Sequence, residues 1–323
     1  MNTYIPFICL AAGAAINWKG LPESVLKLID KIMNIALMFL MAIIGVNIGT
    51  SDDVMSNLSI IGLNCALISV GAVLFSVAVT VLFEKSIMPL EKIRLQVLAE
   101  RESRGLPVPE VKEEKGGLSP LVLIMPGFIA LGIICGYFMF KGSDLSWLDT
   151  ALTISLILLY TSVGVSLADN KAVFGYIKRL GLRVLLMPLA VFIGSVAGGL
   201  AVGVLLGVPA EWSMISGSGM GYYSLTGAFM TENYGIEAGT YGFMVNVLRD
   251  VFTVALLPVL RKISKGSPIA SGAGGCMDTM LVPVTSVVGP ELGMVAIISG
   301  TVITFVVPVW LPVAAGIAGH IFA

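Results

Sequence analysis

Long apolar runs, separated by short polar or glycine-rich stretches, recur along the whole chain. Several of these runs exceed the roughly 20 apolar residues that an α-helix needs to cross the hydrocarbon core of a bilayer. The ten-residue alternation of apolar and polar positions that is typical of a membrane β-barrel is absent. The pattern therefore predicts an all-α polytopic membrane protein with about eight transmembrane helices, at residues 4–16, 32–50, 58–83, 118–140, 148–168, 184–206, 236–260 and 292–319.

Two further apolar stretches, residues 212–231 and 272–290, are rich in glycine, which disfavours a regular helix. Basic residues follow the third and the fifth predicted spans, and we expect both of these loops in the cytoplasm. If the first glycine-rich stretch crossed the membrane, the basic residues Arg261, Lys262 and Lys265 would lie on the other side of the membrane from these loops. We therefore predict two re-entrant or broken segments. Non-helical backbone at membrane depth is tolerated only where it lines a cavity. This topology places both termini outside the cytoplasm.

Composition agrees with a membrane location. Of the 323 residues, 57% are hydrophobic and 12% charged, and the mean hydropathy is +0.97, which is far from a soluble domain. The long hydrophilic stretch, residues 84–117, balances its basic and acidic residues. We expect it to be a cytoplasmic linker and expect no nucleic-acid partner, which would require an excess of positive charge. A single histidine, His320, and four isolated cysteines predict no metal site and no cofactor.

An internal similarity suggests how the chain is organised. Residues Gly164 to Ala168, near the end of the fifth predicted span, resemble Gly45 to Gly49, near the end of the second. Because three spans, an odd number, separate them, residues 1–83 and 118–207 would form an inverted-topology repeat, which lets one site face either side of a membrane. Residues 208–323 would then carry the substrate site. Chance similarity between short glycine- and valine-containing segments is the alternative.

The most informative polar residues lie inside the span at residues 236–260. Asn246 and Asp250 are four residues apart and share a helical face with Thr253, while Arg249 points about 100° away. Ionisable groups at membrane depth are costly, so they are paired, protonated or exposed to water. Two interpretations follow: a structural network of Arg249 and Asp250, or a substrate or proton site.

Other candidates are less distinctive. Glu232 lies near a segment end, where a carboxylate is either solvated or functional, and Asp278 follows two glycines that would free backbone groups in a broken helix. Asp52, with Asp53, would cap the next helix or attract cations at a gate. Backbone and hydroxyl groups expected to line the site belong to Gly217, Ser218, Gly221, Tyr222, Tyr223 and Ser224. The tyrosines would alternatively anchor the membrane interface.

These motifs together resemble a known family. The run from Gly217 to Gly227, the pairs Thr231–Glu232 and Arg249–Asp250, and the run from Cys276 to Pro283 are similar to the bacterial lysine exporter family, of the LysO type. The segment from Gly45 to Ile48 with Asp52 fits its N-terminal part. The resemblance implies an inner-membrane exporter of L-lysine and analogues such as thialysine, with membrane-embedded acidic residues important for transport. Asp250 stands where a glutamate is expected in the family, and the linker at residues 84–117 is longer than expected.

A cationic amino acid suits the candidate residues. Asp250 and Glu232 would meet its ammonium groups, while Arg249 or the backbone amides of residues 217–221 would meet its carboxylate. The hypothesis is alternating access with counter-transport of H⁺ or Na⁺. The expected partners are L-lysine or a similar cationic amino acid and membrane lipids, with a homodimer expected by analogy with cation/proton antiporters.

Other functions remain open from the sequence. One is a monovalent cation/proton antiporter, with Asp250 and Asp278 as cation ligands, and another is a passive channel, which the broken segments disfavour. A membrane-embedded enzyme lacks support, because the sequence has neither a His/Asp/Glu metal cluster nor a Gly-x-Ser-x-Gly motif. We therefore predict a transporter in the cytoplasmic membrane and no enzyme.

Overall fold

Helices make up all of the regular structure in the part of the chain that is described. The computed structural model describes residues 4–88, 90–95, 98, 120–142, 145–169, 177 and 181–322. Beyond residue 95, the predicted linker therefore lies outside the described residues, apart from residue 98. The same holds for Lys171, Lys178 and Arg179, three of the basic residues that follow the fifth predicted span and that we expect in the cytoplasm. The elements are α1 (Ile5–Ile16), α2 (Glu23–Thr50), α3 (Asp52–Ser86), α5 (Pro120–Cys135), η1 (Gly136–Phe140), α6 (Ser146–Asp169), η2 (Leu182–Leu185), α8 (Leu186–Leu205), α9 (Ala210–Ser218), α10 (Tyr223–Tyr234), α11 (Ile236–Ile263), α12 (Ser267–Gly272), η3 (Ala273–Met277), α13 (Leu281–Val288) and α14 (Pro290–Ile321).

Six of the described helices are long and apolar enough to cross a membrane: Glu23–Thr50, Asp52–Ser86, Trp147–Ala168, Leu182–Leu205, Ile236–Ile263 and Pro290–Ile321. Two shorter apolar helices, Ile5–Ile16 and Gly127–Phe140, coincide with the first and fourth predicted spans. The first of these is shorter than a full crossing needs, whereas the second continues a helix that starts at Pro120, and the predicted total of eight spans stays a prediction. The helix α2 starts at Glu23, before its predicted span, and an exposed (i, i+4) ion pair of 2.7 Å between Glu23 and Lys27 lies in its first turns.

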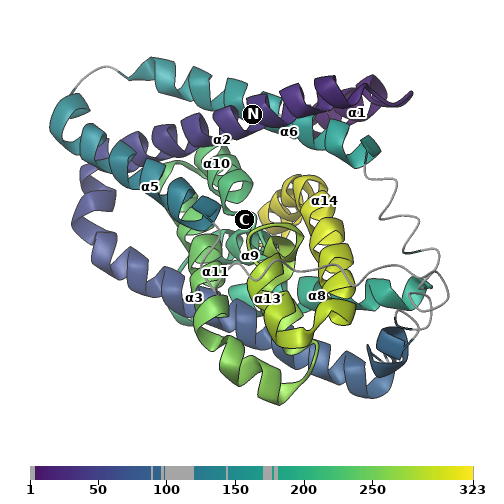
Figure 1. Ribbon diagram of the computed structural model, residues 1–323. Helices are drawn as coiled ribbons and strands as arrows, with labels where there is room; N and C mark the ends of the chain where they lie inside the picture. Colours follow the sequence, from purple (N-terminus) through teal and green to yellow (C-terminus); the bar gives the residue numbers. More distant parts are fainter. Residues whose placement is uncertain are drawn as a thin grey trace.

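Glycines bring the early helices into close contact. Gly13 of α1 lies against Gly164 of α6, and Gly45 of α2 lies against Gly132 of α5. A Cβ atom at any of the four positions would overlap the backbone of the partner helix. Small residues at such crossings let two helix backbones approach, which strengthens van der Waals packing in a membrane. The α2–α5 and α1–α6 pairs form the upper layer in Figure 1.

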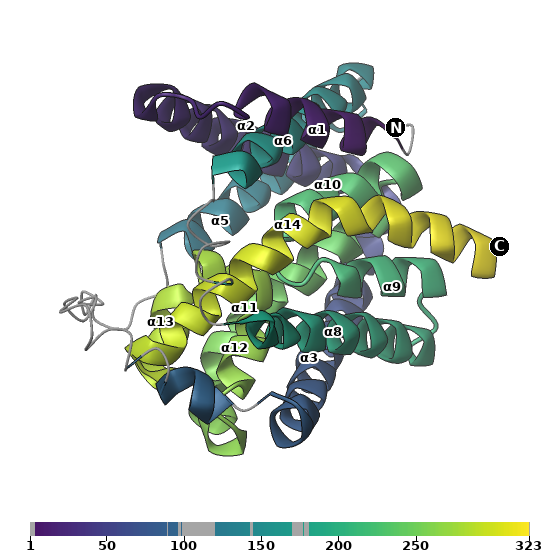
Figure 2. The ribbon, with the colours of Figure 1, turned by 90° about the vertical axis from the view of Figure 1, so that its right-hand side faces the viewer.

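The crossing of α3 and α8 forms the other side of the molecule (Figure 2). Gly194 of α8 lies against the backbone of Ser76 of α3, and the Ser76 hydroxyl donates a hydrogen bond of 3.3 Å to the Val191 carbonyl. Further along α8, Gly198 lies against Gly71. Because the contacts advance along α8 while they retreat along α3, the two helices are antiparallel.

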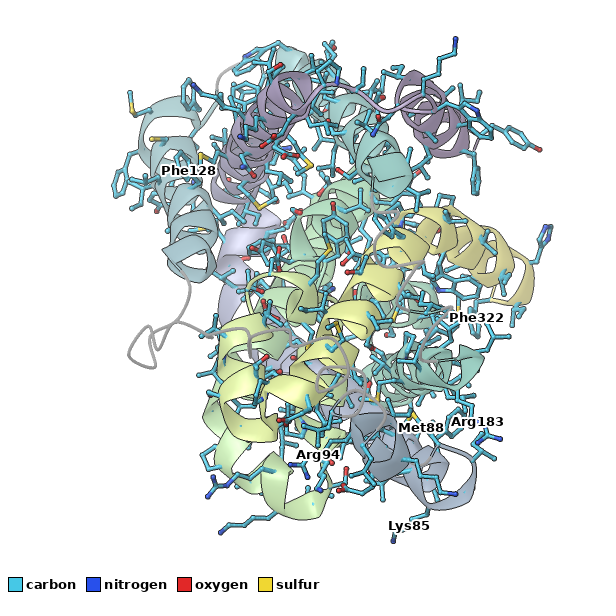
Figure 3. The ribbon with its side chains drawn as sticks, turned by 45° about the vertical axis from the view of Figure 1, so that its right-hand side comes forward. Lys85, Met88, Arg94, Phe128, Arg183 and Phe322 are labelled. Carbon is cyan, nitrogen blue, oxygen red and sulfur yellow. The ribbon has the colours of Figure 1, made fainter. Side chains whose placement is uncertain are left out.

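Basic residues gather at one end of the molecule. Figure 3 shows Lys85, Arg94 and Arg183 at the same end. Lys265, after α11, forms an ion pair with Glu91, and this contact lowers the pKa of the Glu91 carboxyl. The Arg94 Nε atom lies 3.7 Å from the carboxylate Oε2 atom of Glu291, at the start of α14. We call this region the charged end. Figure 2 shows both chain termini towards the side where α8 connects to α9.

Two chain segments between the long helices are interrupted. In the first interrupted segment, residues 210–234, α9 ends at Ser218 and α10 begins at Tyr223. In the second, residues 267–288, α12 and the 3₁₀-helix η3 are followed by α13. Both segments pack against α11 (Figure 1).

Candidate functional site

The first interruption is a tight turn that an uncharged side chain of α11 stabilises. Met220 has φ of 48° and Gly221 has φ of 92°, so the chain leaves the helical conformation at both residues. The Asn246 side chain accepts a hydrogen bond of 2.8 Å from the Gly221 amide and donates one of 3.0 Å to the Ser216 carbonyl. Asn246 therefore satisfies backbone groups on both sides of the break, which would otherwise be unpaired in the protein interior.

The second interruption lies against the first. Ala273 has φ of 46°, a strained value for a residue with a side chain, and its side chain is fully buried. The amide of the next residue, Gly274, donates a hydrogen bond of 2.9 Å to the Met220 carbonyl. A Cβ atom at Gly274 would lie 3.0 Å from this carbonyl oxygen. Glycine therefore permits the close contact between the two breaks.

A cavity of about 170 Å³ lies beside this contact. Its walls come from both interrupted segments and from three long helices, α2, α6 and α14. The lining residues carry hydroxyl, amide and carboxylate groups alongside apolar side chains, and none of them is basic. They are Met33, Asn34, Leu37, Val163, Ser166, Gly221, Tyr222, Tyr223, Ser224, Gly274, Gly275, Met277, Asp278, Thr279, Thr304 and Phe305.

Two carboxylates belong to this region. Asp278 lines the cavity and is exposed to it, and its carboxylate accepts a hydrogen bond from the Thr279 amide. Asp250 is 2% exposed and lies deeper, where its Oδ2 accepts a hydrogen bond of 3.2 Å from the Thr279 hydroxyl. The Asp250 Oδ1 atom is buried and has no hydrogen-bond partner among the described residues. Thr279 thus contacts both carboxylates, through its amide and its hydroxyl.

Glycines keep the space next to the Asp250 carboxylate open. A Cβ atom at Gly275 would lie 3.2 Å from Asp250 Oδ1, and one at Gly221 would lie 3.6 Å from it. One turn along α11, the Thr253 hydroxyl is 2.7 Å from the Ser271 hydroxyl of α12. The predicted polar face of α11 therefore contacts both interrupted segments.

Arg249 points away from this cavity. Its guanidinium is buried and donates hydrogen bonds to the hydroxyls of Ser76 and Ser195 and to the carbonyls of Ala270 and Ser271. No ion pair joins Arg249 to a carboxylate among the described residues. Its described hydrogen bonds are therefore all with neutral groups of the protein.

Two other predicted carboxylates lie outside the cavity lining. Glu232 is half-buried and accepts a hydrogen bond of 3.0 Å from Thr153 of α6. Asp52, in the first turn of α3, forms an exposed ion pair with Lys141, and this contact raises the pKa of the Lys141 ammonium group. Ser51 provides the N-cap of α3, since its hydroxyl accepts from the Val54 amide.

The residues predicted to line the site divide into two groups. Gly221, Tyr222, Tyr223 and Ser224 line the cavity. Gly217 instead packs against α8. The Ser218 hydroxyl donates a hydrogen bond to the Met214 carbonyl and accepts one from the Trp310 indole. The walls supplied by α2, α6 and α14 were not predicted, because single polar residues there, such as Asn34 and Thr304, carry no recognisable motif.

Comparison with known proteins places this arrangement in a family. The sequence matches the model of one family, described as lysine exporter LysO, over residues 7–95 and 127–315. It is 24% identical to the lysine exporter LysO of Escherichia coli (strain K12) over 290 residues, which cover 89% of this chain and 90% of that protein. It is also 25% identical over 156 residues to a protein of Haemophilus influenzae named "Putative lysine exporter", covering 48% of this chain and 80% of that protein. No solved structure matches the chain significantly.

The family match covers most of the chain and includes every wall of the cavity, so the resemblance inferred from the sequence is confirmed. Several helices long and apolar enough to cross a membrane agree with it. This chain is a multi-pass membrane protein that belongs to the lysine exporter LysO family, a family of transporters and not of enzymes.

Proposed function

We propose that this protein exports L-lysine, or a similar cationic amino acid, across the cytoplasmic membrane. The observation that carries the proposal is the chemistry of the cavity. Asp278 lines it, Asp250 lies directly behind, and no lining residue is basic. Such a lining favours a cation with further hydrogen-bonding groups. The name of the Escherichia coli relative supports lysine as the cation.

Lysine presents ammonium groups and one carboxylate, and the cavity offers partners for both. Asp278 is the proposed partner of an ammonium group, with Asp250 near enough to share its charge. The first amides of α10, those of Tyr223 and Ser224, make no hydrogen bond within the described residues, as is normal for a helix start. These amides are the proposed partners of the substrate carboxylate, because a helix N-terminus favours an anion.

An inverted repeat is part of the proposed mechanism, and the helix packing supports it. Gly13 contacts the Thr161 carbonyl, and Gly132 contacts the Ala42 carbonyl. Gly13 and Gly132 are 119 residues apart in the sequence, as are Ala42 and Thr161. The same contact therefore occurs twice, with the roles of the two halves exchanged. A two-fold relation between residues 1–83 and 118–207 would produce this pattern.

The direction of the helices supports the inversion of one half. From Gly13 of α1 to Asn17, the residue that follows α1, the contacted residue of α6 advances from Thr161 to Val165, whose carbonyl accepts a hydrogen bond of 3.0 Å from Asn17. The helices α1 and α6 are therefore parallel. If successive helices alternate in direction across the membrane, α6 is antiparallel to α2, its counterpart in the repeat. Such a pair of halves is suited to alternating access.

The two interrupted segments are proposed to be re-entrant from opposite sides. Tyr234, at the end of the first, is hydrogen-bonded to Glu211, near its beginning, so both ends of this segment lie together. The second segment begins after Lys265 and ends before Glu291, and both of these residues belong to the charged end. We propose that the charged end faces the cytoplasm, because cytoplasmic loops carry the excess of basic residues.

One further contact is a candidate gate. Asn34 of α2 lines the cavity, and Thr153, 119 residues later on α6, is instead bonded to Glu232. Thr153 and Ser166, a cavity residue on the same helix, are 13 residues apart, about 20 Å along the helix axis. We propose that the Thr153–Glu232 hydrogen bond helps to close the pathway on the side away from the cavity.

The test is efflux of labelled lysine from proteoliposomes that contain the purified protein. Ornithine, arginine and sodium serve as competitors, and imposed pH and sodium gradients are varied one at a time. Saturable lysine efflux that a pH or sodium gradient drives would support export with counter-transport. Equal efflux with and without the gradients would refute the coupling to H⁺ or Na⁺. Sodium-driven proton movement without lysine flux would instead identify a cation/proton antiporter.

A further inference from the structure

The most unusual group outside the substrate cavity is the guanidinium of Arg249. It is 2% exposed, lies within a span of apolar helix and has no carboxylate partner among the described residues. An arginine side chain has five N–H donors. Four of these donors form hydrogen bonds: two to the hydroxyls of Ser195 (2.7 Å) and Ser76 (3.2 Å), and two to the carbonyls of Ser271 and Ala270 (both 2.9 Å). We call these five residues the Arg249 cluster.

The cluster joins α11 to three other elements. Ser76 belongs to α3, Ser195 to α8, and Ala270 and Ser271 to the second interrupted segment. The first interrupted segment is reached through Ser195, whose hydroxyl donates a hydrogen bond of 2.7 Å to the Gly217 carbonyl at the end of α9. Arg249 thus ties the second interrupted segment to the crossing of α3 and α8, and Ser195, to which Arg249 donates, ties the first.

The two serines are equivalent positions in the proposed repeat. Ser76 and Ser195 are 119 residues apart, the same separation as that of Gly13 and Gly132 and of Gly45 and Gly164. A single guanidinium therefore donates to the same residue type at the same position of each half. Their bonds differ, since the one to Ser195 is shorter by 0.5 Å than the one to Ser76. If the two halves exchange conformations, the two bonds should exchange as well.

We propose that Arg249 is a positioning residue that couples both interrupted segments to the α3–α8 crossing, with Ser76 and Ser195 as its alternating anchors. In the conformation of this structure, Arg249 has its shorter hydrogen bond with Ser195. When the carrier opens to the other side of the membrane, Arg249 has its shorter hydrogen bond with Ser76. The planar fork of arginine suits this role, because it reaches two hydroxyls and two carbonyls at once, which a lysine ammonium cannot. The proposal rests on the alternating-access part of the proposed function.

A pair of single-cysteine reporters tests the exchange without any substrate. Leu37 lines the cavity and Leu156, 119 residues later, is fully buried. The substitutions Leu37→Cys and Leu156→Cys, each alone in a chain whose native cysteines are replaced by alanine, are labelled with a small water-soluble maleimide in purified protein. The ratio of the two labelling rates reports which side is open. The chain without either reporter supplies the blank.

The expected changes have opposite signs. Ser195→Ala should lower the ratio of labelling at position 37 to labelling at position 156, and Ser76→Ala should raise it. Each change should be at most about ten-fold, the factor for complete loss of one hydrogen bond to a charged group, because each bond changes in strength between the two states. Shifts of both variants in the same direction, or no shift in either, would overturn the proposal. These serine-to-alanine changes remove one hydroxyl each, so folding should survive, and a monodisperse elution profile checks it.

Export supplies an independent readout. Arg249→Lys keeps the charge but loses the fork, so we expect a lower maximal rate of lysine efflux with little change in KM. A raised KM with an unchanged maximal rate would mean that Arg249 binds the substrate carboxylate, against the proposal. If the unmodified protein moves no lysine but the two serine variants still shift the labelling ratio in opposite directions, the substrate assignment fails and the role of Arg249 stands.

Discussion

The Asn246 side chain offers the clearest test of how the first interruption is held. Replacement by leucine keeps the branched shape and the number of heavy atoms and removes every polar atom of the side chain. The structure has three hydrogen bonds to lose, one from the Gly221 amide (2.8 Å) and two donated to the Ser216 (3.0 Å) and Gly242 (2.8 Å) carbonyls. The variant therefore separates a structural role of Asn246 from direct contact with the substrate.

The magnitude follows from the partners that remain. The Ser216 carbonyl still accepts from the Gly219 amide, and the Gly242 carbonyl keeps its bond within α11. The buried Gly221 amide has no other partner among the described residues. At about 1 kcal/mol for each hydrogen bond, and with one buried donor left unpaired, Asn246→Leu should lower the free energy of unfolding by about 3 kcal/mol. That is a substantial part of the roughly 5–15 kcal/mol that is typical of a protein domain.

Thermal unfolding of the purified protein in detergent measures this loss, and lysine efflux from proteoliposomes measures the effect on the cavity. Asn64→Leu is the matched control, because Asn64 of α3 donates a single hydrogen bond of 3.2 Å to the Tyr241 hydroxyl. The control should cost at most about 1 kcal/mol. An Asn246→Leu protein that unfolds like the unmodified chain would refute the reasoning. Unchanged unfolding with a raised KM for lysine would show that Asn246 contacts the substrate.

Three further predictions concern other parts of the molecule. Gly132→Ala should lower the free energy of unfolding by about 1–3 kcal/mol, because its Cβ would overlap the α2 backbone. Gly127→Ala, on the same helix, is the control and should not lower it, because the space around its Cβ is open. Thermal unfolding compares the two variants. Asp278→Asn should abolish lysine efflux, because it removes the charge that the proposed site offers to an ammonium group. The melting temperature should stay unchanged, since the amide oxygen of asparagine can still accept a hydrogen bond from the Thr279 amide. A normal efflux rate would contradict the proposed site. Thr153→Val removes the hydrogen bond to Glu232, so passive leak of labelled lysine should rise, and an unchanged leak would contradict the proposed gate.

Much of the helical architecture was accessible from the sequence, because a span needs only length and apolar composition to be recognised. Helix ends were less predictable. Asp52 extends α3 beyond its apolar core because Ser51 caps the helix. The similarity of residues 164–168 to residues 45–49 was visible because both segments carry a glycine at a helix crossing. Gly13 and Gly132, which the proposed repeat would pair, lie among different neighbours in the sequence, so a short pattern does not reveal them.

The site was predictable only where periodicity applies. The spacing of Asn246 and Asp250 predicted their common face, and both lie on the face of α11 that contacts the interruptions. It also separated Arg249 from them, but the partners of Arg249 come from helices distant in the sequence and carry single hydroxyls without a motif. Glu232 was grouped with Asp250 because both are acidic, and its contact with Thr153 depends on tertiary packing alone.

The position of Arg249 has a consequence for the response to membrane voltage. When Asp250 and Asp278 are both ionised, the guanidinium leaves the central region with one net negative charge. Lysine, with one net positive charge, would make the loaded carrier electrically neutral, so the potential would act on the return of the empty carrier instead. Each elementary charge that crosses about 100 mV involves about 2.3 kcal/mol. A negative interior opposes inward return of a negative site, and a proton or sodium ion bound on the outside would remove that barrier.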